Sequence, residues 1–217
     1  MGAAPYGPGI ALIAPINPIG DQKLNEGEIR EARMKGILFK PDMIQAIIEG
    51  RKTQTRRLIK PQPVQFNNLG EFDAGIGEAW FHGITSDNWE TRKPRYQVGE
   101  TAYIKEAWAS FPAYEPHKPY VTYKSSVDAY RLGSTKWKSP LFMPEWAARY
   151  FLEITEVRAE RLQEIRYLDI FLEGVPEQGG FIKNFKAFER LWNSINKDYP
   201  WESNPWVWVY IFELQAK

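Results

Sequence analysis

The sequence contains no cysteine and only two histidines, His82 and His117. The missing thiols exclude a disulfide framework, a thiolate nucleophile and a cysteine-ligated metal. The two histidines are too far apart in the sequence to read as a ligand pair, so we expect no structural zinc and no other cofactor. A chain without cysteine suits a reducing compartment, which favours a cytoplasmic location.

Long apolar runs and a strong net charge are also missing. No run of about 18 apolar residues is present, so we expect no membrane-spanning helix and no membrane partner. The apolar stretch from Ile10 to Ile19 is interrupted by Pro15 and Pro18, which argues against a secretory signal. The formal net charge is +1, so contact with nucleic acid requires a local basic patch.

Aromatic residues are abundant, with 12 Phe, 11 Tyr and 9 Trp among 217 residues. Such side chains supply core surface, and Trp and Tyr also serve interfaces and base-stacking sites. The length suits one elaborated domain. Residues 1–33 begin rich in Gly, Pro, Ala and Ile, so we expect an N-terminal arm there and the domain at 34–217. A docking arm for a protein partner is the alternative reading of 1–33.

Short strands and short helices alternate along the predicted domain. Pro41 begins a helix that Gly50 ends. Further helical patterns lie at 167–174 and 185–195, and the longest strand patterns at 150–161 and 206–214. Two loop insertions interrupt them, the longer at residues 60–95. We therefore predict an α+β fold with a mostly antiparallel sheet closed into a barrel.

A basic segment, Arg51-Lys52-Thr53-Gln54-Thr55-Arg56-Arg57, directly follows the first predicted helix. Its alternating pattern predicts a strand with two distinct faces. The cations can neutralise phosphates, which predicts salt-sensitive binding. Two structural readings remain open. Arg51 and Lys52 can cap helix carbonyls, and the threonines and arginines can form an ordinary solvated strand face.

The segment Glu49–Arg57 resembles the signature of the ASCH domain family, in which a helix ending in Gly precedes a Lys-x-x-Thr-x-Arg-like strand. The resemblance covers Met34 to Leu214, and the stretches 191–196 and 204–208 are similar to prophage-encoded members. Three further marks follow in the family's order: the turn Val98-Gly99-Glu100, the central strand Glu153–Val157 and the closing strand Trp206–Leu214.

This resemblance implies a PUA-like β-barrel with short flanking helices that holds RNA or a modified nucleoside in a basic cleft. One branch of the family removes the acetyl group of 4-acetylcytidine with a lysine, a threonine and a glutamate. Residue by residue, these roles fall on Lys52, Thr55 and Glu173.

The three implied residues have a coherent chemistry. A threonine hydroxyl attacks a carbonyl only after a base takes its proton. Lys52 can be that base if its pKa falls below about 10.4, and both burial and the neighbouring Arg51, Arg56 and Arg57 would lower it. A carboxylic acid at Glu173 can then protonate the leaving amine, and Arg51 or a backbone amide can hold the oxyanion.

Other side chains extend the predicted ligand contacts. Lys105 and Trp108 lie in a predicted strand at 101–108, where Lys105 can instead form a surface pair with Glu106. Three tryptophans in predicted loops, which can form a lid or a protein contact, are Trp80, Trp89 and Trp137. The residues expected to bind ligand are Arg51, Arg56, Arg57, Lys105 and Trp108.

Three functions follow from the sequence. The leading one is a module that binds RNA or a modified nucleoside, which requires the basic strand to be exposed in a cleft. The second is a 4-acetylcytidine amidohydrolase, which requires Lys52, Thr55 and Glu173 to converge on one site. The third is a phage-type scaffold for protein interaction, which requires exposed apolar surface elsewhere.

Overall fold

The computed structural model describes residues 34–63, 66–73, 77–83, 89–111, 120–126 and 135–215. The predicted arm at 1–33 and His117 lie outside these residues. The described part combines strands with three α-helices, so the α+β prediction is confirmed. None of the helices described is long and apolar enough to cross a membrane.

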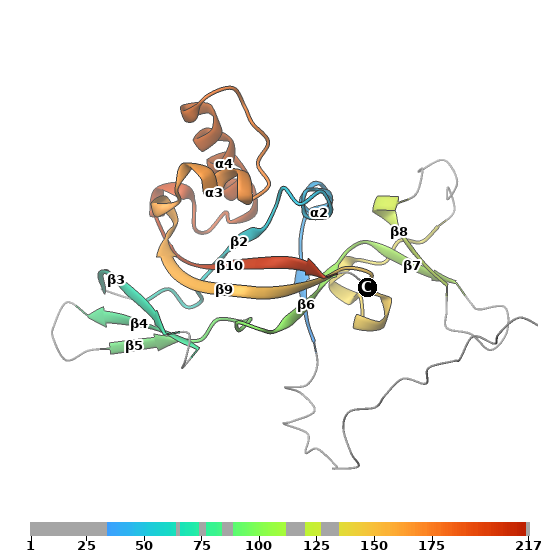
Figure 1. Cartoon of the computed structure of the whole chain (residues 1–217), viewed down its shortest axis with the longest axis horizontal. Helices are drawn as coiled ribbons and strands as arrows, with labels where there is room; N and C mark the ends of the chain where they lie inside the picture. Colours follow the sequence, from blue (N-terminus) through green and yellow to red (C-terminus); the bar gives the residue numbers. More distant parts are fainter. Residues whose placement is uncertain are drawn as a thin grey trace, which may run out of the picture. The chain divides into compact units, whose positions relative to one another are not determined.

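The main sheet has five strands in the order β1-β6-β9-β10-β2 (Figure 1). Only β1 and β6 pair in parallel, so the sheet is mostly antiparallel, as predicted. Within the described residues no ladder joins the edge strands β1 and β2, and the predicted closure into a barrel is not found. The strands span Lys35–Leu38 (β1), Gln54–Leu58 (β2), Thr101–Lys105 (β6), Phe151–Arg161 (β9) and Trp206–Gln215 (β10).

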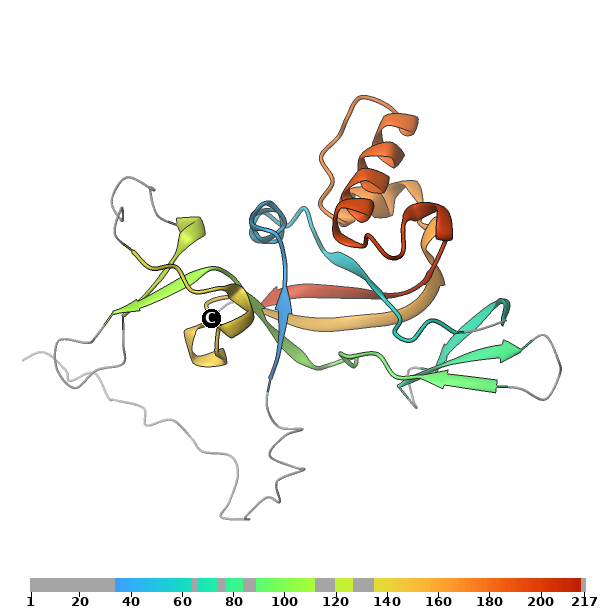
Figure 2. The same ribbon diagram turned by 180° about the vertical axis from the view of Figure 1, so that it is seen from behind.

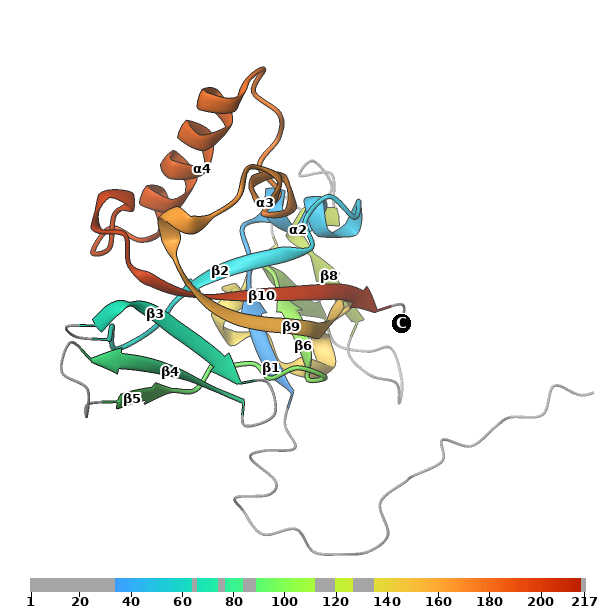
Figure 3. The same cartoon turned by 60° about the vertical axis from the view of Figure 1, so that its left-hand side comes forward.

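The two faces of β10 explain how the layers pack. Val207 and Val209 pack with Phe188 and Trp192 of α4 (Phe181–Ile195). On the opposite face lie the aromatic residues Trp206, Trp208, Tyr210 and Phe212, which join the largest core cluster. Helices α3 (Tyr167–Leu172) and α4 therefore cover one side of β9 and β10. Figures 1 and 3 both show this arrangement.

The predicted loop insertion at 60–95 contains a three-stranded antiparallel sheet of β3 (Phe66–Asp73), β4 (Glu78–Gly83) and β5 (Trp89–Arg92). Trp80 and Trp89 therefore lie on strands and not in loops. Phe81 of β4 is fully buried, and its ring lies 4.9 Å from that of Trp206. The insertion thus contributes to the core, because its apolar face covers the aromatic face of β10.

The predicted strand at 101–108 is two strands, because β6 ends at Lys105 and β7 (Trp108–Phe111) pairs with β8 (Tyr120–Tyr123) instead. Figure 2 shows this hairpin from behind. Residues 140–147, which precede β9, contain two 3-10 turns, Pro140–Phe142 and Glu145–Ala147.

Two helices end in the same way. Helix α2 (Pro41–Ile48) ends with Gly50 at φ +72°, and α3 ends with Gly174 at φ +86°. In α2 the Arg51 N–H donates to Ala46 O at 2.9 Å, and the Val175 N–H makes the equivalent bond to Ile170 O at 3.3 Å. Glycine adopts this left-handed conformation without the penalty that a Cβ imposes. Both predicted terminations are therefore confirmed.

Candidate functional site

The ends of α2 and α3 meet at an isolated antiparallel bridge between Lys52 and Glu173. Lys52 follows Gly50 by two residues, and Glu173 is the C-cap of α3. The Thr53 N–H donates to Leu172 O at 3.0 Å, which joins the two backbones directly. The two glycine-terminated turns therefore bring together residues that are far apart in the sequence.

The Lys52 ammonium is buried, and three oxygens accept its hydrogen bonds. Lys52 Nζ lies 3.0 Å from Glu173 Oε2, 2.7 Å from Glu173 O and 2.7 Å from Gln54 O. It therefore caps the last carbonyl of α3, and not the helix that precedes it. Burial lowers the pKa of Lys52 from its ordinary value, and the Glu173 carboxylate offsets this only in part.

Arg56 is surrounded by three carboxylates. Its Nη1 donates to Glu173 Oε1 at 2.9 Å, its Nη2 to Asp169 Oδ2 at 3.1 Å and its Nε to Glu160 Oε1 at 2.8 Å. Burial of Asp169 opposes its ionisation, but hydrogen bonds and charge from Arg166 and Arg56 hold its pKa below the ordinary value. These ion pairs occupy the guanidinium, which orients Glu173, and the ligand contact expected of Arg56 stays a prediction.

Lys52, Thr55 and Glu173 all line one cavity of about 400 Å³, here named the Lys52 cavity. Its remaining wall is mainly apolar and includes residues of β1, β2, α2 and α4. A concave, mostly apolar site with a few convergent polar groups is typical of a small-molecule pocket. The other lining residues are Leu38, Phe39, Lys40, Met43, Arg56, Arg57, Leu58, Phe188, Leu191, Trp192, Ile195 and Asn196.

Arg57, the next residue on β2, has a different environment. Its Nη2 donates to Leu38 O, and its guanidinium carbon lies 5.1 Å from the centre of the Phe39 ring. Its buried Nε has no hydrogen-bond partner among the described residues. No carboxylate of the described chain forms an ion pair with Arg57, so this cation remains able to contact a ligand.

The structure places the other predicted ligand residues away from the Lys52 cavity. The half-exposed Arg51 pairs with Glu49 outside it, which removes Arg51 as a group for the oxyanion there. Lys105 Nζ donates to Leu141 O at 2.9 Å. Trp108 is buried in a separate cluster with Met143, because β7 leaves the main sheet.

Sequence reasoning missed Glu160 and Asp169, the carboxylates that position Arg56. A signal for Glu160 exists, since charged residues alternate at positions 156, 158 and 160 of β9 and thus share one face. Arg158 also joins this group through Glu160, with Nε 3.1 Å from Oε2. Among the residues described, no group of His, Asp or Glu side chains is arranged to hold a metal ion.

Comparisons with known proteins add little to this geometry. No family model matches the chain, and no curated protein matches it. One solved structure that matches is protein EF3133 from Enterococcus faecalis V583, described by the family model DUF984. The match has a TM-score of 0.40 and 10% sequence identity over 83% of this chain and 80% of that chain. A likeness at this level carries no functional argument.

Substituting Gly174 with alanine tests how closely the two helix ends are packed. An added Cβ at this φ of +86° lies 3.1 Å from Lys52 Cβ, whereas a Cβ at Gly50 meets nothing within 4 Å. The strained backbone alone costs about 1–2 kcal/mol at either position. We expect urea denaturation to show a larger loss for Gly174→Ala than for the matched control Gly50→Ala. Equal losses would contradict the close contact with Lys52.

Proposed function

We propose that the chain is an amidohydrolase of the ASCH type that removes an acyl group from the exocyclic amine of a nucleobase, with 4-acetylcytidine as the first substrate to test. One observation carries the proposal. Lys52 Nζ lies 3.0 Å from Glu173 Oε2 in the wall of a cavity that the Thr55 side chain also lines. Residues that can supply a base, a carboxylate and a hydroxyl nucleophile thus line the same cavity.

In the proposed reaction, Thr55 Oγ1 attacks the acyl carbonyl while neutral Lys52 accepts the hydroxyl proton. The C–N bond then breaks, and the Lys52 ammonium, in place of the Glu173 acid expected from the sequence, returns the proton to the leaving amine. This leaves an ester on Thr55, and water hydrolyses it with Lys52 again acting as base. Glu173 holds the lysine nitrogen in place, and Arg56 holds Glu173.

The direct test is a product assay. Purified protein is incubated with 4-acetylcytidine, and cytidine is separated by chromatography and quantified. We expect cytidine release in proportion to enzyme concentration, with acetate formed in equal amount. The proposal fails for this substrate if no cytidine appears even when the enzyme and substrate concentrations are equal.

The rate is expected to fall as the pH is lowered through the pKa of Lys52, because the ammonium cannot accept a proton from Thr55. Burial lowers this pKa, so the midpoint of the pH–rate profile should lie below about 10.4. The Lys52→Arg variant keeps the charge but cannot deprotonate, and it should be inactive throughout. A rate independent of pH from about 6 to 10 would exclude Lys52 as the base.

A binding module without catalysis is the second candidate. It is favoured by the three acceptors around Lys52 Nζ, which satisfy all three N–H groups of an ammonium. Such a module should bind 4-acetylcytidine and release it unchanged. Isothermal titration with the nucleoside, followed by recovery of intact ligand, separates this function from hydrolysis.

A further inference from the structure

A second cavity of about 460 Å³, here named the Arg95 cavity, shares Leu38, Arg57 and Leu58 with the Lys52 cavity. Its wall contains five cationic side chains and no carboxylate. The cations come from β2, β6 and the segments that flank the insertion sheet. They are Arg57, Lys60, Lys93, Arg95 and Lys105.

Most of this charge is not neutralised by protein groups. Lys93 pairs with Glu78 at 2.8 Å, but in the described part of the chain the other four cations form no ion pair. Lys105 donates instead to the neutral Leu141 carbonyl. Like charges gathered in one concave site raise the local potential, and they attract a counter-ion or an anionic ligand.

Two tyrosines, Tyr96 and Tyr210, line the Arg95 cavity and are held in place by hydrogen bonds and ring packing. The Tyr96 hydroxyl donates to Gly36 O at 2.9 Å, and its ring packs 5.3 Å from that of Tyr210. The Arg95 backbone N–H donates to the Tyr210 hydroxyl at 3.0 Å, and the Arg95 guanidinium lies 5.6 Å from the centre of the Tyr96 ring. A hydroxyl that accepts one hydrogen bond can still donate another, so Tyr210 adds a neutral donor.

Arg57 connects the two cavities. It lines both of them, and its buried Nε has no partner among the described residues. A buried N–H without an acceptor is unfavourable, and an arginine fork suits the oxygens of a phosphate. A ligand that extends from the Lys52 cavity past Arg57 therefore places a hydrogen-bond acceptor, such as a phosphate oxygen, among the cations of the Arg95 cavity.

We propose that the Arg95 cavity is a phosphate subsite for the same ligand whose acylated base enters the Lys52 cavity. The inference rests on the proposed function and makes its substrate class more specific: a phosphorylated nucleoside, either a free nucleotide or a nucleotide within RNA. The phosphate is held by Arg57, Lys60, Arg95 and Lys105.

The test is an equilibrium measurement that needs no turnover. Isothermal titration compares cytidine, cytidine 5′-monophosphate and a five-nucleotide oligocytidylate on the full chain. We expect the monophosphate to bind about tenfold more tightly than cytidine, with a difference that shrinks as salt increases. If the natural source is RNA, the oligonucleotide should bind still more tightly and show a steeper salt dependence. Equal affinities of the oligonucleotide and the monophosphate would identify a free nucleotide.

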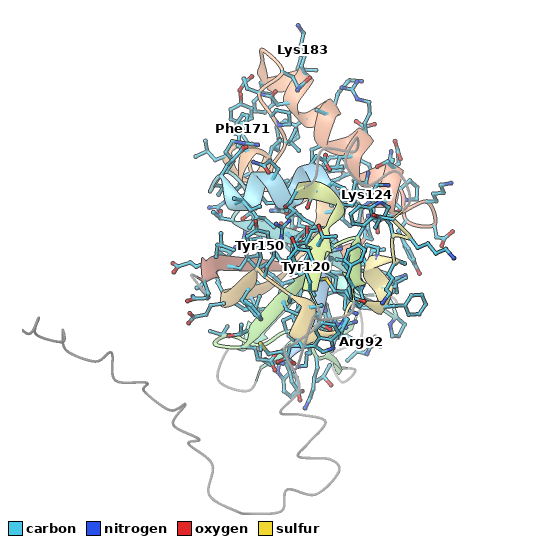
Figure 4. The ribbon with its side chains drawn as sticks, turned by 90° about the vertical axis from the view of Figure 1, so that its right-hand side faces the viewer. Arg92, Tyr120, Lys124, Tyr150, Phe171 and Lys183 are labelled. Carbon is cyan, nitrogen blue, oxygen red and sulfur yellow. The ribbon has the colours of Figure 1, made fainter. Side chains whose placement is uncertain are left out.

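A pair of matched variants locates the phosphate. The double variant Lys60→Gln/Arg95→Gln should bind the monophosphate no more tightly than cytidine. The control Lys183→Gln/Lys186→Gln removes the same charge from exposed positions on α4 and should keep the preference. Figure 4 shows Lys183 at the end of the described part opposite Arg92 of β5. All four residues are exposed, so both double variants are expected to fold.

The outcomes separate this inference from the proposed hydrolase. A tenfold preference for the monophosphate in a protein that releases no cytidine from 4-acetylcytidine supports the subsite and contradicts the hydrolase. Cytidine release without any preference for the monophosphate supports the hydrolase and overturns the subsite. Equal loss of the preference in both double variants, or no binding of the monophosphate, also overturns the subsite.

Discussion

The Thr55→Ala variant should hydrolyse 4-acetylcytidine at least about 10³-fold more slowly than the parent chain, with the loss in kcat. Thr55 is buried and lines the Lys52 cavity, and in the proposed reaction its hydroxyl oxygen forms the bond to the acyl carbon. Removing it leaves the pocket and the Lys52–Glu173 pair intact, so the affinity for the substrate should change little. Steady-state kinetics with chromatographic product detection measures both quantities.

Thr53→Ala is the matched control for this prediction. Thr53 lies two residues earlier in the chain and has the same side chain, but it does not line the Lys52 cavity. The control should retain the parent kcat to within a few-fold. Thr55→Ser keeps a hydroxyl and should retain measurable activity. If Thr55→Ala and Thr53→Ala reduce kcat equally, Thr55 is not the nucleophile.

The Arg56→Met variant should lose about 3–5 kcal/mol of unfolding free energy, because it removes the central cation of a buried cluster of carboxylates. Methionine fills much of the arginine volume but leaves Glu160, Asp169 and Glu173 without their shared partner. The side chains of Arg56, Asp169 and Glu173 are only 1%, 4% and 7% exposed, so water cannot replace the guanidinium. Urea denaturation followed by circular dichroism gives the difference.

Arg51→Met is the control for Arg56, because the ion pair of Arg51 with Glu49 is exposed and screened by solvent, so its loss should change the unfolding free energy little. Acid titration adds a second measurement. The folded-state pKa of Asp169 is lowered, so its stabilising contribution is present above about pH 3.9 and is lost as the pH falls through the folded value. Arg56→Met should weaken this acid dependence. Equal stability losses for Arg51→Met and Arg56→Met would refute the buried network.

The ends of α2 and α3 were predictable because their cause is local. Gly50 and Gly174 both adopt positive φ, and a glycine after an apolar helical stripe is a direct sequence signal for such a turn. The long strand β10 was equally predictable, because aromatic and β-branched residues alternate along it. The sequence did not predict the sheet of β3, β4 and β5, because polar residues and glycines within 60–95 obscure the apolar pattern of its buried face.

The candidate site was likewise predictable only in part. The family resemblance in the sequence points to Lys52, Thr55 and Glu173, and the structure brings them to one cavity. The carboxylate partners of Arg56 were not predictable, because Glu160 and Asp169 become its neighbours only through the tertiary fold. Neighbouring strand residues point to opposite faces, which is why Arg56 is neutralised while Arg57 is not.

The position of β10 has a consequence for how the chain is made. Residues 206–215 form a central strand that pairs with β9 on one side and β2 on the other. A growing chain that has not yet reached Trp206 therefore carries two unpaired strand edges, which are templates for aggregation. Closing such distant contacts is entropically slow, so folding should be late and cooperative. Lys52 and Glu173 should acquire their final geometry only after residues 206–215 have been synthesised and have paired with β2 and β9.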